Sequence, residues 1–108
     1  MTDEARYHQT MKAFLLIDIA INDRDGFMEY VGQIGELIAT YGGEYVVRGE
    51  VPTVVLPKET LPERVVVIEF PSRDNAERFL KEREEKGLAA LFARATTSRI
   101  LLTDGVQE

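Results

Sequence analysis

The fold is decided by AFLLIDIAI, the stretch at residues 13–21. The stretch is rich in β-branched and aromatic residues, which predicts a β-strand. Its odd positions are all apolar, as expected of a face that packs against a core. Its even positions, Phe14, Leu16, Asp18 and Ala20, are mostly apolar too. A sheet with helices on one side normally alternates apolar and polar residues, so this strand needs cover on both faces.

Two further stretches share this property, RVVVIEF at 64–70 and TSRILLT at 97–103. In each, one set of alternate positions suits a helix-covered face and the other set is still largely apolar. The side chains left on the opposite face form an apolar patch: Phe14, Leu16, Val65, Val67 and Leu101. Burying one such side chain is worth ~1.5–3 kcal/mol. We therefore expect a second copy of the chain to cover the patch, in a homodimer with two-fold symmetry, with Arg99 in the same interface.

The stretches between these strands predict helices and one further strand. Asp23 is a good N-cap for a helix that begins at Arg24 and ends at the glycine pair 42–43. Within it, Gly32 and Gly35 suggest a close approach to another backbone. A strand at 44–48 is followed by an arm at 51–56, which Pro52 and Pro57 confine to a sheet edge.

A second helix follows Ser72, its mixed charges at 73–86 are interpreted as a solvated face, and a short helix follows at 88–95. The order β-α-β-β-α-β is the ferredoxin-like arrangement, an α+β fold in which helices cover one face of an antiparallel sheet. With 108 residues, we expect one domain at 12–105, a flexible extension at 1–11 and a tail at 106–108.

Composition excludes several classes of function. The net charge of -6 disfavours nucleic acid and anionic membranes as partners. The chain has no cysteine, and its one histidine, His8, lies in the polar extension, so we expect neither a metal site nor a cofactor. Nothing at the start resembles a signal peptide and no apolar stretch is long enough to span a bilayer. We therefore expect a cytoplasmic protein.

Polar residues on the predicted strands are the candidate site. Strict alternation places Asp18, Arg48, Glu69 and Arg99 on the helix-free face. Asp18 and Glu69 are separated along the sheet, so they are not interpreted as a paired catalytic dyad. These groups either form salt bridges between subunits or line a ligand pocket. Arg94, beside the short apolar helix, either reaches solvent or turns inward as an anion clamp.

The sequence also resembles a known family of uncharacterised proteins, domain of unknown function 1330. The resemblance rests on YGGEYVVRG at 41–49, RVVVIEFPS at 64–72 and RATTSR at 94–99, together with Asp23, Tyr30 and Ala76. It extends from Met11 to about Gly105. It implies the dimeric α+β barrel superfamily, in which two ferredoxin-like subunits pack their sheets together. Glu50 departs from the family, which usually has glycine there.

Three functions fit these observations. The first is a dimer that binds a small polar or anionic organic ligand between sheet and helices, contacted by Asp18, Arg48, Glu69 and Arg94. The second, implied by other members of that superfamily, is a cofactor-independent monooxygenase or isomerase. It would use Asp18 or Glu69 as a carboxylate base in an apolar setting. The third is a dimeric interaction module with no ligand.

Overall fold

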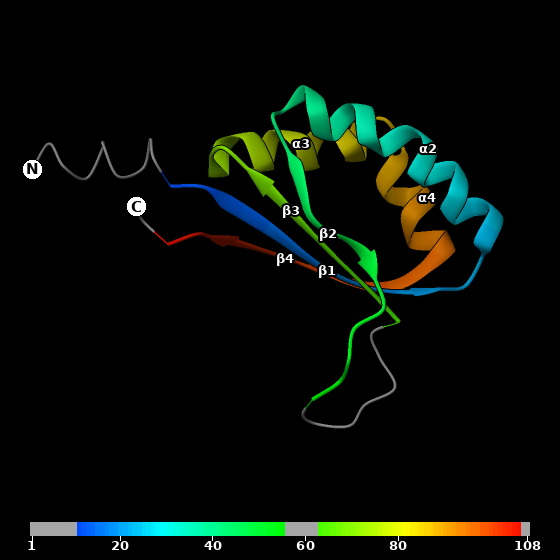
Figure 1. Ribbon diagram of the computed structural model, residues 1–108. Helices are drawn as coiled ribbons and strands as arrows, with labels where there is room; N and C mark the ends of the chain where they lie inside the picture. The colour runs from blue at the N-terminus through cyan, green and yellow to red at the C-terminus, as the bar shows by residue number, and fades with distance from the viewer. Residues whose placement is uncertain (1–10, 56–62, 107–108) are drawn as a thin grey trace, which may run out of the picture.

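The computed structural model describes residues 11–55 and 63–106. Within these ranges, the strands form one antiparallel sheet in the order β2-β3-β1-β4. The strands are β1 (Ala13–Ile21), β2 (Glu44–Glu50), β3 (Arg64–Phe70) and β4 (Thr96–Asp104). The helices are α2 (Arg24–Thr40), α3 (Arg73–Glu85) and α4 (Leu88–Ala95), and they gather on one side of the sheet (Figure 1). The predicted ferredoxin-like α+β fold, with β1 and β3 in the centre, is confirmed.

Local signals set the helix ends. The Asp23 carboxylate accepts a hydrogen bond from the Gly26 amide at 3.2 Å, which caps α2. The Ser72 hydroxyl accepts one from the Asn75 amide at 3.1 Å, which caps α3. Gly87 joins α3 to α4 in the left-handed conformation, with φ of 80°. These caps fix where each helix begins, and hence which of its faces meets the sheet.

The odd positions of β1 are buried against the helices, from Ala13 to Ile19. Ile68 and Phe70 of β3 join them in the core, and Ile100 and Leu102 of β4 pack against it. The predicted inward face of each of these three strands is therefore confirmed.

The opposite face carries an apolar row that crosses every strand of the described sheet. Leu16 pairs with both Val67 and Leu101, and Val67 also pairs with Val47. We call these four residues the apolar row. Leu16 is 37% exposed and Leu101 46% exposed, so the predicted patch exists in the single chain. The row is flanked by polar positions, with Glu69 on one side and Asp18 on the other.

The structure corrects the predicted orientation of Arg48. The pairing shifts register between Tyr45 and Val47, so that Arg48 pairs with Val66 rather than with Val65. A one-residue shift moves a side chain to the other face of a sheet. Val66 packs against the core, and Arg48 therefore lies on the helix side.

Two predictions about α2 and the arm also need correction. A side chain at Gly32 or Gly35 would meet nothing within 4 Å, so no backbone in the described chain approaches either glycine. Residues 51–55 leave the sheet without forming a strand, while the remainder of the predicted arm, Leu56 and Pro57, lies outside the described residues.

Among the helices that the structure describes, none is long and apolar enough to cross a membrane.

Candidate functional site

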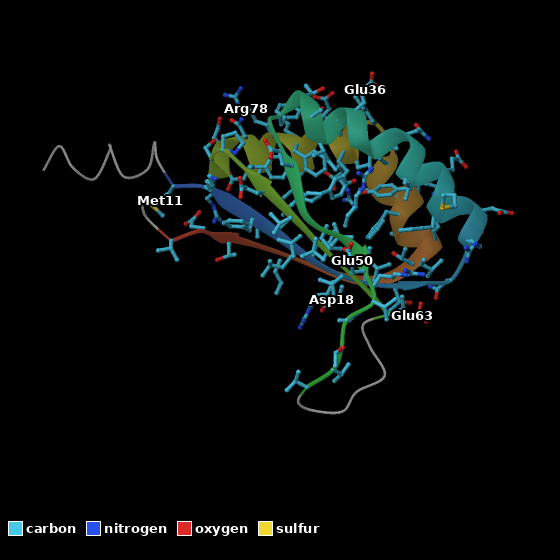
Figure 2. All side chains as sticks on the ribbon, in the orientation of Figure 1. Met11, Asp18, Glu36, Glu50, Glu63 and Arg78 are labelled. Carbon is cyan, nitrogen blue, oxygen red and sulfur yellow. The ribbon has the colours of Figure 1, made fainter. Side chains whose placement is uncertain are left out.

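The two candidate carboxylates lie on the helix-free face of the sheet. Asp18 accepts a hydrogen bond from the Arg99 guanidinium at 2.7 Å, across the β1–β4 pair. Glu69 forms an ion pair with the Lys12 ammonium at 3.0 Å. Figure 2 shows Asp18 on the side of the sheet turned away from the helices. Neither carboxylate is therefore placed to contact a ligand held between sheet and helices.

The two candidate arginines lie apart from these carboxylates. Arg94 is exposed in the last turn of α4, which agrees with the solvent-facing alternative. Arg48 lies over the ring of Tyr45, with 4.7 Å between the guanidinium carbon and the ring centroid. The four predicted ligand contacts thus form no single cluster, and only Arg48 lies on the helix side of the sheet.

A different cluster forms where α2, α3 and α4 meet. Its centre is Arg83, which is 7% exposed. Nε of Arg83 donates a hydrogen bond to the Tyr30 hydroxyl at 2.8 Å. The guanidinium carbon also lies 5.0 Å from the ring centroid of Phe92 and 5.5 Å from that of Tyr30. Side chains from α2, α3 and α4 therefore surround one buried cation.

Burial raises the pKa of the Tyr30 hydroxyl above its ordinary value of 10.0, and the nearby phenol of Tyr45 adds to the rise, while Arg83 opposes it. Burial likewise raises the pKa of Tyr45, and Arg48 opposes that rise. Arg83 thus contacts Tyr30 and Phe92, Arg48 lies over Tyr45, and Tyr45 is near enough to influence the pKa of Tyr30. We call these five residues the arginine–tyrosine cluster. Because both pKa values are raised, both phenols stay neutral at neutral pH.

Arg83 has no anionic partner in the described part of the chain. None of the ion pairs there includes it, and its hydrogen bond to Tyr30 uses only one of five N–H donors. No buried side-chain nitrogen or oxygen among the described residues lacks a partner. The terminal nitrogens of Arg83, which make no hydrogen bond within the described residues, are therefore not completely enclosed by protein.

The sequence contains a pattern that indicates burial of Arg83, but the many charged residues around it favoured a different interpretation. Ala76, Phe79 and Arg83 recur at helical spacing and are all buried. The dense mixed charges at 73–86 instead suggested a solvated face for the whole segment. That interpretation holds for the exposed residues of α3 and is wrong for Arg83. Tyr45 and Phe92 gave no such signal, because each occupies an ordinary apolar position of its own element.

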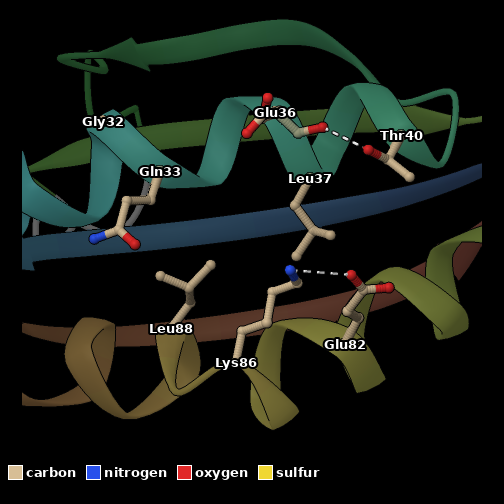
Figure 3. A pocket seen from close by; sticks show the side chains of 8 residues that line it. All are labelled: Gly32, Gln33, Glu36, Leu37, Thr40, Glu82, Lys86 and Leu88. Carbon is tan, nitrogen blue, oxygen red and sulfur yellow. Dashed lines mark hydrogen bonds and ion pairs between the residues drawn. The ribbon is translucent and has the colours of Figure 1, made fainter.

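A polar groove of ≈ 460 Å³ opens between α2 and the junction of α3 with α4 (Figure 3). The side chains of Gln33, Lys86 and Leu88 converge on it. Glu82, on the same wall, is engaged on two sides, by the Tyr41 hydroxyl and by Lys86 at 3.5 Å. Arg83 and Tyr30 do not line this groove, so the groove and the arginine–tyrosine cluster are separate features of the helix layer.

Metal-binding groups do not gather in the described residues. No set of three or more histidine, cysteine, aspartate or glutamate side chains there is placed to hold a metal ion. His8 lies outside the described residues. The arginine–tyrosine cluster offers guanidinium and phenol groups, which form hydrogen bonds and, for the guanidinium, ion pairs.

Fold and site together define a small ferredoxin-like α+β domain with a cationic, aromatic cluster beneath its helices. The chain belongs to the family described as Domain of unknown function (DUF1330), whose model matches residues 12–106. No curated protein matches the sequence.

Solved structures share the fold at low sequence identity. The RPA0582 protein of unknown function from Rhodopseudomonas palustris has a TM-score of 0.70 and 13% identity, over 99% of this chain and 94% of that chain. The hypothetical Arabidopsis thaliana protein AT3G17210 has a TM-score of 0.57 and 12% identity, over 92% and 88%. SnoaB, a cofactor-independent oxygenase from Streptomyces nogalater, has a TM-score of 0.56 and 16% identity, over 91% and 95%.

Proposed function

We propose that this protein binds a small anionic organic ligand at the arginine–tyrosine cluster. The observation that carries the proposal is the buried guanidinium of Arg83, which has no carboxylate partner in the described chain. A buried charge without a counter-charge costs several kcal/mol, and a carboxylate, enolate or phosphate on a ligand would remove that cost. The buried rings of Tyr30 and Phe92 pack against the guanidinium and hold it in place for such a group.

Arg48 and Tyr45 supply the second side of this site. Arg48 is exposed and lies over a half-buried ring, so its guanidinium is free to turn toward an anion at little cost. A ligand would then be held by one fixed arginine and one adaptable arginine. Asp18, Glu69 and Arg94, which the sequence suggested as further contacts, have no part in this site.

Thermal unfolding with simple anions tests the proposal. Suitable probes are benzoate, salicylate, succinate and inorganic phosphate. A ligand at one hundred times its Kd adds about 2.7 kcal/mol of stability, which is a rise of roughly 10 °C in Tm for a domain of this size. The rise should vanish in Arg83→Met and persist in Arg78→Met, a matched change at an exposed position of the same helix. A rise in Tm that persists in both variants would reject the site.

We also propose that the protein is a homodimer joined through the helix-free face of the sheet. The apolar row and the neighbouring Phe14 and Val65 support this, because monomeric proteins rarely expose a contiguous apolar patch. Arg99 and Asp18 would then lie at the edge of the interface. Sedimentation velocity should show a dimer at micromolar concentration, and a monomer at ~100 µM would contradict the proposal.

The likeness to SnoaB favours a second candidate, a cofactor-independent oxygenase. Without a cofactor, the substrate itself must donate electrons to oxygen, which requires a base to form its anion. Asp18 or Glu69 would be that base, between the two sheets of a dimer. Oxygen uptake with enolisable and phenolic compounds should then fall in Asp18→Asn or Glu69→Gln. Unchanged turnover in the double variant would eliminate this role.

A further inference from the structure

An uncharged arm follows β2. Residues 51–55, VPTVV, contain no charged side chain, although charged residues make up 30% of the chain. Val51 is 67% exposed, Val54 37% and Val55 84%. Among the described residues, no hydrogen bond joins the arm to the body of the domain. Three exposed valines in five residues form an apolar surface, and its burial against a partner would be favourable.

The arm is continuous with the helix-free face of the sheet. It begins directly after Glu50, which pairs with Val65 on that face. Figure 1 shows the arm projecting beyond the sheet, on the side away from the helices. Any body that covers the apolar row would therefore also come within reach of the arm.

We propose that the arm packs against a second copy of this chain and completes the dimer interface. This inference rests on the proposed homodimer. A stable interface buries ~800 Å² on each partner, so an interface centred on the apolar row gains from additional apolar surface beside it. The arm adds three valines at the edge of the same surface.

Charge restricts which surfaces two copies can bring together. Each copy carries a net charge of -6, so two copies repel wherever their acidic surfaces meet. The arm and the apolar row are the uncharged parts of this side of the molecule, and contact between them avoids that repulsion. Pro52 has no backbone N–H, which opposes extension of β2 as an ordinary strand. We therefore expect the arm to contribute side-chain contacts.

Cysteine labelling tests the arm directly, because the chain has no cysteine of its own. Val55→Cys places one thiol on the arm, and the control Met28→Cys places one at a 56% exposed position of α2, on the helix side of the sheet. The rate of maleimide labelling should fall at least fivefold for Val55→Cys when the protein is concentrated above the dimer Kd. The control should react at one rate throughout.

A second variant measures the energetic role of the arm. Val54→Thr with Val55→Thr keeps the side-chain shape but replaces one methyl group of each valine with a hydroxyl. We expect the dimer Kd to rise at least tenfold, while Val31→Thr, at a 40% exposed position of α2, leaves it unchanged. The inference is overturned if the protein is a dimer but Val55→Cys is labelled at one rate at all concentrations and the double threonine variant has the wild-type Kd. The proposed homodimer would still stand. A monomeric wild-type protein would overturn both.

Discussion

Replacing Arg83 by methionine tests whether this residue supports the fold or serves a ligand. The substitution removes a charge-assisted hydrogen bond to Tyr30, worth about 1.5–3 kcal/mol. It also removes two cation–π contacts, at 5.0 and 5.5 Å, worth about 0.5–2 kcal/mol each. Against these losses, the folded state no longer buries an unpaired cation, which costs several kcal/mol. The two sides nearly cancel, so we expect Arg83→Met to change the free energy of unfolding by less than about 2 kcal/mol.

Tyr30→Phe should cost more, although it removes a single oxygen. It leaves Nε of Arg83 buried without its only hydrogen-bond partner in the described chain, and an unsatisfied charged donor costs roughly 3 kcal/mol. In a chain that already carries Arg83→Met, the same tyrosine change should cost about 1 kcal/mol or less. The double-mutant cycle should therefore show a coupling of about 2 kcal/mol.

Urea unfolding followed by far-ultraviolet circular dichroism measures these changes, since the chain has no tryptophan to report by fluorescence. Arg78→Met is the matched control, because Arg78 is on the same helix and 68% exposed. It should stay within about 0.5 kcal/mol of wild type. A loss above about 4 kcal/mol in Arg83→Met would refute the reasoning and make Arg83 a structural residue. Equal costs for Tyr30→Phe in both backgrounds would refute the proposed pairing.

Gly35→Ala should stabilise α2 by about 1 kcal/mol in urea unfolding, because a side chain there meets nothing within 4 Å; a destabilised variant would contradict this open setting. Gly43→Ala should destabilise by about 1–3 kcal/mol, since its methyl group would lie 2.7 Å from a core side-chain atom. Asp23→Ala should cost about 1 kcal/mol through loss of the α2 cap, and no change would show the cap to be dispensable. The raised pKa of Tyr30 and of Tyr45 gives stability that is complete below pH 10 and falls as the pH rises through the folded values. Unfolding midpoints measured from pH 9 to 12 should therefore decline, more weakly in Tyr30→Phe.

Most of the fold was predictable from short stretches of sequence. The alternation in β1, β3 and β4 identified which residues face the helices, because side chains in a strand alternate with a period of two. Asp23 and Ser72 marked the helix starts for an equally local reason, since each caps an amide three residues away. The prediction was wrong for Arg48. One extra residue in β2 moves the Arg48 side chain to the other face of the sheet, and no residue type in β2 indicates that extra residue.

The sequence by itself determined a sheet that is apolar on both faces, because that property belongs to each strand separately and survives whatever surrounds it. Only the tertiary structure decided the candidate site. Arg83, Tyr30, Phe92 and Tyr45 come from α3, α2, α4 and β2, and they come near one another because the helices gather on one face of the sheet (Figure 1). A charged residue on a mostly solvated helix is buried or exposed according to which neighbour covers its flank, and that neighbour is distant in sequence.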